Sequence, residues 1–103
     1  MAQGCYNALK DAGKENIPIV STGGSPDGFK MLQDGIEAAN MTAPVSIQGV
    51  KTFMNLYNKV ALGEDPAEKF TALPVIPVSA DDTSSYIAWD DYAAAYKYLG
   101  ENK

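Results

Sequence analysis

The stretch from Ser21 to Gly28 constrains the fold of this chain more than any other part of the sequence. It reads Ser-Thr-Gly-Gly-Ser-Pro-Asp-Gly, follows a short apolar run at 17–20 and precedes an amphipathic pattern. That order is typical of a strand, a glycine turn and a helix, with Ser25 as the N-cap and Pro26 as the first helical residue. Ligands of open α/β sheets bind at the carboxyl ends of strands, where such turns lie. The turn therefore predicts both a fold class and the position of a site.

The same turn has a simpler interpretation, in which Gly23 and Gly24 only allow the chain to reverse its direction. A nucleotide site is disfavoured, because no Lys-Ser/Thr pair follows the glycines and their spacing does not spell G-x-G-x-x-G. The turn alone thus leaves open whether a ligand is involved.

The rest of the chain alternates between helical and strand patterns. Helices are predicted over 2–12, 26–35, 46–62 and 89–99, and strands over 17–21, 38–42 and 73–79. This alternation predicts an α/β fold, a three-layer αβα arrangement with a mainly parallel sheet. Pro74 and Pro77 cannot donate to a sheet ladder, so their strand should be an edge strand or irregular. The apolar stripes of the 46–62 and 89–99 helices are expected to face the sheet, and Gly63 should end the first of them.

Charge and composition exclude several classes of function. The net charge is −5, and the chain has eight lysines but no arginine and no histidine, which argues against binding of nucleic acid. The lone Cys5 precludes an internal disulfide, and its helical spacing with Leu9 and Ala12 predicts a buried structural thiol. We find no activated nucleophile, metal cluster or cofactor motif, so an enzyme is not expected and no cofactor is assigned.

Two weaker features have plain alternatives. The acid pairs Asp81-Asp82 and Asp90-Asp91 resemble acid–base or cation-binding pairs, but adjacent acids more often stay solvated or lie at helix N-termini. Trp89, with Tyr86 and Tyr92, is a potential stacking platform for a sugar ring, although aromatic residues at helical spacing are more typical of a core.

The ends and apolar stretches of the sequence show no targeting signal. Residues 1–4 lack a charged region and a long apolar stretch, so no signal peptide is expected there. No apolar stretch reaches the length that spans a bilayer.

Several short motifs occur in an order that resembles a known family. They are Gly4, Leu9 and Gly13, then Ile17-Pro-Ile-Val20 and the Ser21–Gly28 turn, then Asp34-Gly35, Ala38-Ala39-Asn40-Met41 and Gly49. Over residues 1 to about 80 this order resembles the C-terminal part of type I periplasmic sugar-binding proteins. The ribose-binding branch of the solute receptors of ABC transporters is the most similar pattern.

The resemblance implies a non-catalytic protein with two α/β lobes, joined by three crossing segments, that closes on a sugar or polyol and delivers it to an ABC permease. Residues 1–43 would be part of the second lobe, 44–80 part of the first lobe after a crossing at Ala43-Pro44, and 81–103 the return segment and terminal helix. This chain is then expected to be a C-terminal fragment of such a receptor. The full-length family is periplasmic or lipid-anchored outside the cell.

The resemblance also implies a ligand site, formed by Thr22, Gly23, Gly24, Ala43 and Trp89. Gly23 stands where the ribose-binding branch has an aspartate, and Ala43 where it has a glutamine that hydrogen-bonds sugar hydroxyls. A sugar or polyol other than ribose, bound through the backbone of residues 22–24, is therefore expected.

Two other functions remain open from the sequence. One is the effector-binding core of a LacI-type transcription regulator, which shares this fold, and the other is an α/β scaffold without a ligand. The acidic composition favours the transport receptor over the regulator. As a fragment of a two-lobed receptor, the isolated chain should bind no sugar at micromolar affinity. It should also self-associate as a homodimer, because its sheet edges and apolar helix faces would be uncovered.

Overall fold

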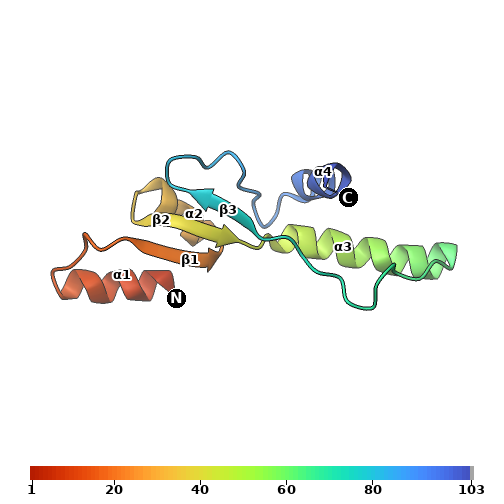
Figure 1. Ribbon diagram of the computed structural model, residues 1–103, viewed down its shortest axis with the longest axis horizontal. Helices are drawn as coiled ribbons and strands as arrows, with labels where there is room; N and C mark the ends of the chain where they lie inside the picture. Colours follow the sequence, from red (N-terminus) through yellow and green to blue (C-terminus); the bar gives the residue numbers. More distant parts are fainter. Residues whose placement is uncertain (103) are drawn as a thin grey trace. The chain divides into compact units, whose positions relative to one another are not determined.

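The computed structural model describes residues 1–102, which divide into two compact units. Unit 1 comprises residues 1–43 and 75–86, and unit 2 comprises residues 44–74 and the chain from Ile87 onward. The elements in chain order are α1 (Ala2–Asp11), β1 (Ile19–Gly23), α2 (Pro26–Gln33), β2 (Glu37–Thr42), α3 (Val45–Tyr57), the π-helical turn η1 (Asn58–Leu62), β3 (Ile76–Ser79) and α4 (Tyr92–Glu101) (Figure 1).

The strand, turn and helix predicted from the Ser21–Gly28 stretch are confirmed. Ser25 is the N-cap of α2, where its hydroxyl accepts a hydrogen bond from the backbone N–H of Gly28 at 3.2 Å, and Pro26 opens the helix. Asp27 in the first turn adds a favourable interaction with the helix dipole. The strand itself begins two residues later than predicted, and Ile17 is 46% exposed.

The sheet is mixed, with the strand order β1-β2-β3. β1 and β2 are parallel, as predicted, but β3 is antiparallel to β2. The chain leaves β2 at Thr42 and returns opposite the same residue at Ile76, so β3 can only run back along β2. β3 is an edge strand, as its prolines predicted. Residues 75–80 consequently group with unit 1 instead of with 44–74.

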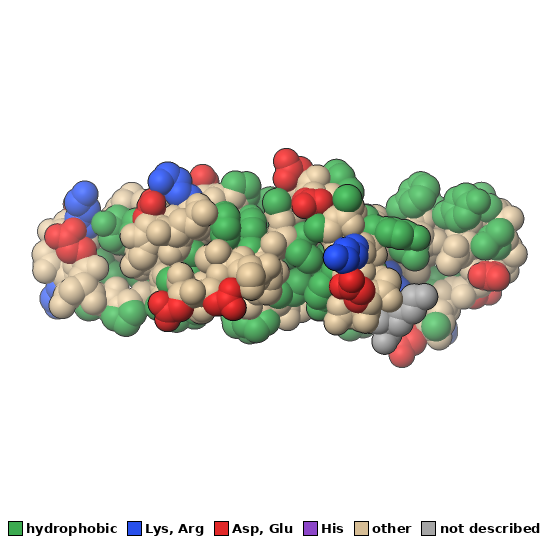
Figure 2. Space-filling model, turned by 90° about the horizontal axis from the view of Figure 1, so that it is seen from above, with side chains coloured by type: hydrophobic (Ala, Val, Ile, Leu, Met, Phe, Trp, Pro, Cys, Tyr) green, Lys and Arg blue, Asp and Glu red, His purple; other side chains and the backbone are tan. Residues whose placement is uncertain are grey.

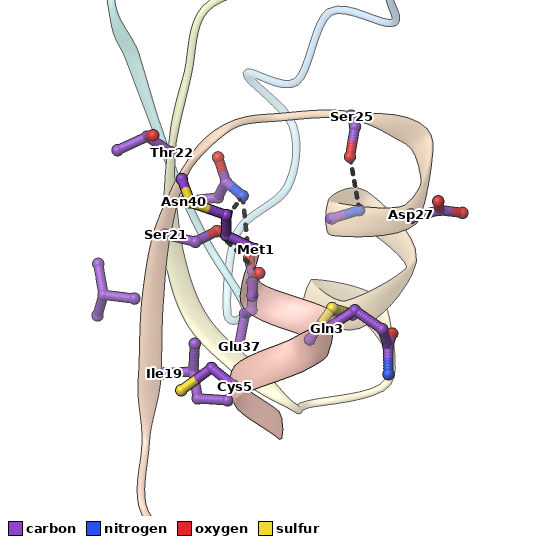
Figure 3. Close-up of a pocket in the computed structure, with 14 residues that line it drawn as sticks. Met1, Gln3, Cys5, Ile19, Ser21, Thr22, Ser25, Asp27, Glu37 and Asn40 are labelled. Carbon is purple, nitrogen blue, oxygen red and sulfur yellow. Dashed lines mark hydrogen bonds between the residues drawn. The ribbon is translucent and has the colours of Figure 1, made fainter. Parts of the chain in front are cut away.

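Unit 1 has helices on one face of its sheet. α1 contacts β1, α2 contacts β2, and both helices border the same cleft (Figure 3). On the other face Val20 is 65% exposed and Met41 is 40% exposed. The described residues of unit 1 are therefore a two-layer α/β structure, and a third layer remains a prediction.

Unit 2 is built around the pair α3 and α4. The Ser46 hydroxyl at the start of α3 donates to the Ala88 carbonyl at 3.0 Å, and Ile47 and Ala95 are buried. The expectation that these helices face the sheet stays a prediction, because the sheet belongs to unit 1 and the described part of unit 2 contains no strand. Part of the apolar stripe is exposed: Phe53 is 65% exposed and Val60 is 77% exposed.

The far end of α3 continues into η1 and ends at Gly63, as predicted, with φ +70°. Within residues 1–102, no helix combines the length and the apolar character needed to cross a membrane.

Candidate functional site

The predicted site residues Thr22, Gly23, Gly24 and Ala43 lie at the end of the sheet where β1 and β2 both finish. Gly23 is opposite Thr42 in the parallel register, and the Ala43 N–H donates to the Gly23 carbonyl at 3.2 Å. The structure thus brings these residues together at the carboxyl ends of two neighbouring strands. We call this end of unit 1, residues 22–24 and 43, the rim.

The conformation of the rim is fixed by packing around Gly24. Its φ of +68° suits glycine, and a Cβ at this position would lie 2.6 Å from the Cβ of Thr42. Thr42 is itself buried, and its hydroxyl donates to the Ile76 carbonyl at 2.7 Å. The Tyr86 hydroxyl donates to the Gly24 carbonyl at 3.1 Å. Every strand of unit 1 therefore contributes to holding this turn.

The aromatic residues considered from the sequence as a stacking platform are divided between the two units. The Tyr86 ring stacks on Phe29 of α2, with ring centroids 3.8 Å apart and an interplanar angle of 4°. Trp89 and Tyr92 belong to unit 2, where Trp89 is half-buried and Tyr92 is 60% exposed at the start of α4. Tyr86 thus packs within unit 1, and the ligand role of Trp89 remains a prediction.

A cleft of about 460 Å³ lies beside the rim, between α1, β1 and α2 (Figure 3). Its floor is a ring of hydrogen bonds among Ser21, Glu37 and Asn40. The Ser21 hydroxyl donates to Glu37 Oε1 at 2.8 Å, and Asn40 Nδ2 donates to Glu37 Oε2 at 3.0 Å and to Ser21 Oγ at 2.7 Å. Glu37 is 0% exposed and Asn40 is 1% exposed. The cleft therefore has a buried, polar floor.

Sequence reasoning did not find this polar floor. Its signal is the presence of the polar residues Ser21, Glu37 and Asn40 in the two strands, and the strand register is needed to show that they lie close together. Cys5, which was expected to be a buried thiol, lines the cleft and is exposed. The expectation of a buried thiol is wrong because α1 buries none of its residues.

All four residues of the acid pairs are exposed, and one of them is a helix cap, in agreement with the simpler interpretation. Asp91 is the N-cap of α4 and accepts from the Ala94 N–H at 2.9 Å. Hydrogen bonds from Ser84, first from its side chain and then from its backbone, lower the pKa of Asp82 below its ordinary value. Within residues 1–102, no group of three or more His, Cys, Asp or Glu side chains is arranged to hold a metal ion.

Known proteins match part of the chain. No family model matches it. The ribose import binding protein RbsB of Escherichia coli (strain K12) is 36% identical over 73 residues, which cover 68% of this chain and 23% of the relative. The RbsB protein of Salmonella typhimurium is 36% identical over 70 residues, with the same coverage. The chain thus spans about a quarter of the length of these relatives, and its similarity to a sugar-binding transport protein is partial.

Proposed function

We propose that this chain supplies part of a non-catalytic sugar receptor of an ABC importer. The observation that carries the proposal is the similarity to RbsB, which covers 68% of this chain. The position of the rim supports it, because the carboxyl ends of parallel strands are where α/β proteins bind ligands. The ligand would be a sugar or polyol, and the partner an ABC permease.

In this proposal the two units belong to different lobes. Unit 1 would be the part of the second lobe that carries the rim, and unit 2 would be the part of the first lobe that follows the crossing at Ala43-Pro44. The restriction that Pro44 places on Ala43 suits an extended crossing segment. In the complete receptor, further helices would cover the open face of the sheet and give the three-layer αβα arrangement. Such a receptor works in the periplasm or anchored outside the cell.

The ligand of the rim would differ from ribose. Gly23 and Ala43 bring no polar side chain to the sugar, so hydroxyl groups would bind to the backbone of residues 22–24. The carbonyls of Gly23 and Gly24 already accept hydrogen bonds from Ala43 and Tyr86, which holds the backbone in place before a ligand arrives. Trp89 would contact the same sugar or polyol from the first lobe. An effector-binding core of a LacI-type regulator has no support from the relatives described above.

By itself, this chain would have only one partial wall of the sugar cleft. Sugar affinity requires most hydroxyls to be paired and water to be excluded by closure. We therefore expect no sugar to bind the isolated chain at micromolar affinity, which corresponds to about −8 kcal/mol. We also expect the chain to self-associate as a homodimer through the exposed apolar residues of unit 2, such as Phe53 and Val60. Hydrophobic side chains, coloured green, are widely visible on the surface in Figure 2.

Assembly with the missing lobe parts tests the proposal. The Escherichia coli RbsB protein, with its matched stretch deleted, is co-expressed with this chain and purified through a tag on the RbsB part. We expect the chain to co-purify in equal amount. Phe53→Asp should abolish co-purification, because Phe53 is 65% exposed on α3 and would be covered by the first lobe. Gln48→Asp, also at an exposed position of α3, is the matched control. A chain that fails to co-purify, or two variants that behave alike, would contradict the proposal.

A further inference from the structure

The two edges of the sheet in unit 1 differ in how well they are closed to another strand. At β3, Pro77 and Ser79 direct their backbone groups outward, since these directions alternate along a strand and the Ala80 N–H donates to β2. Pro77 has no N–H, and its carbonyl accepts from the Ser85 hydroxyl at 3.2 Å. The Ser79 carbonyl accepts from the Asp82 N–H at 3.3 Å. The β3 edge is therefore largely closed.

The edge at β1 is open. The Gly23 carbonyl accepts from the Ala43 N–H, so by the same alternation Ser21 also faces β2, whereas the backbone groups of Val20 and Thr22 face outward. Within residues 1–102, the backbone of neither outward-facing residue has a hydrogen bond outside the ladder with β2. Val20 is 65% exposed, and Thr22 is also exposed. The β1 edge therefore presents N–H and C=O groups that another strand can pair.

The sequence around β1 lacks the features that usually keep an edge strand unpaired. Natural edges carry a lysine, an inward-pointing charge, a proline or a bulge. Residues 17–24 contain no charged side chain, and their only proline, Pro18, lies before the strand. The register shift between Ile19 and Val20 leaves residues 20–23 regular. Because the net charge of −5 makes copies of the chain repel one another, an uncharged strand is where two copies can approach.

We propose that unit 1 binds a second copy of this chain through β1, with the two strands antiparallel and the two-fold axis at Ser21. In this register Val20 of each copy lies opposite Thr22 of the other, and the two residues exchange both backbone hydrogen bonds. The pairing uses the outward-facing groups of Val20 and Thr22 in both copies, and places these two β-branched side chains together on the open face of the sheet.

The neighbours of these residues exclude the other registers. A shift by two residues in one direction would require an N–H from Pro18, which has none. The opposite shift would require Gly24, whose φ is +68° and whose carbonyl already accepts from the Tyr86 hydroxyl. A shift by one residue would set outward-facing groups against groups already bonded to β2. This interface is separate from the association expected through unit 2, and it does not depend on the chain being a sugar receptor.

Amide hydrogen exchange tests whether the β1 edge is paired. The chain carries Phe53→Asp, which removes the apolar contact expected through unit 2 at a position that is 65% exposed. As the concentration is raised, the Val20 and Thr22 amides should lose their fast exchange in proportion to the fraction of dimer. The Ser21 amide faces β2 and should be protected at every concentration. A chain that stays monomeric, or a dimer in which the Val20 and Thr22 amides still exchange fast, would overturn the proposal.

Two lysine substitutions in the same Phe53→Asp chain distinguish the edge from the open face of the sheet. Val20→Lys and Met41→Lys both add a charge at an exposed position of that face, but Met41 lies on β2, away from the second copy. In sedimentation equilibrium, Val20→Lys should weaken the dimer at least about tenfold, because it disrupts both symmetry-related pairs, whereas Met41→Lys should weaken it less than about twofold. Equal weakening would indicate face-to-face association and contradict the edge pairing.

Disulfide formation tests the register. Val20→Cys and Thr22→Cys are made as separate variants in a chain that also carries Cys5→Ser and Phe53→Asp. The two variants should form a disulfide when mixed, because these positions lie opposite each other. Neither variant should link to itself, since identical positions would lie more than about 7 Å apart, beyond the reach of a disulfide. A mixture that does not link, or a variant that links equally well to itself, would rule out this register.

Discussion

Replacement of Gly24 by alanine tests how the rim is held. A methyl group at this position would lie 2.6 Å from both Cβ and Cγ2 of Thr42, and 3.2 Å from its Cα. Thr42 cannot easily yield, because it is buried in β2 and its hydroxyl is bonded to the Ile76 carbonyl. The substitution should therefore push β1 and β2 apart at the end where the candidate ligand site lies.

The magnitude has two parts. The left-handed backbone at Gly24 costs an alanine about 1–2 kcal/mol, and forced crowding in a packed region adds about 1–3 kcal/mol. The expected loss of unfolding free energy is thus about 2–5 kcal/mol, a large share of the stability of a small domain. Gly35→Ala is the matched control, because Gly35 has a similar φ of +73° and open space around its Cβ. The Gly35→Ala control should lose only the unfolding free energy that the left-handed backbone costs, about 1–2 kcal/mol.

Urea unfolding, followed through the amide NMR signals of unit 1, measures both variants without assuming that the two units unfold together. The reasoning predicts that Gly24→Ala is less stable than Gly35→Ala by about 1–3 kcal/mol. Adding Thr42→Ser, which removes Cγ2 and keeps the hydroxyl, should recover part of that difference. Equal losses in the two alanine variants would refute the claim that contact with Thr42 fixes the rim.

Three further outcomes follow from the local structure. Ser25→Ala should lower the stability of unit 1 by about 1 kcal/mol, whereas Ser25→Asp should preserve the cap, as measured by the same urea unfolding. Because the Ser84 hydrogen bonds lower the pKa of Asp82 in the folded state, their contribution to stability is present above about pH 4 and is lost as the pH falls through the folded pKa. A carboxyl NMR titration should place that folded pKa below the value in the urea-unfolded chain, and identical values would contradict the assignment. Cys5 should react with a thiol reagent as fast in the folded chain as in urea, since it is exposed, and protection in the folded state would show that α1 packs more closely.

Local signals predicted the local structure well. Ser25 and Pro26 define the start of α2, Gly63 ends the helical segment begun by α3, and Pro77 marks an edge strand, because each of these residues acts through its own backbone or its near neighbours. The gathering of the rim residues also followed from sequence order, since the ends of two adjacent parallel strands must meet.

The remaining features depend on contacts between distant residues, and periodicity does not encode them. The direction of β3 is set by the point at which the chain returns to β2. Thr42 pairs with Ile76 and donates a hydrogen bond to its carbonyl, and these two residues are thirty-four positions apart in the sequence. The apolar stripe around Phe53 has the spacing of a buried face, yet Phe53 is exposed, and within unit 2 helix α4 packs against α3. The floor around Glu37 required the register of two strands, which the sequence does not state.

Sugar binding by the assembly of this chain with the remainder of RbsB tests the central claim most directly. Calorimetry with pentoses, hexoses and polyols is carried out on the co-purified assembly, on the isolated chain and on the RbsB part alone. If the chain supplies part of a receptor wall, at least one of these ligands should bind the assembly at micromolar affinity and should bind neither part alone. An assembly that binds none of them, or an isolated monomeric chain that binds one at micromolar affinity, would contradict the account.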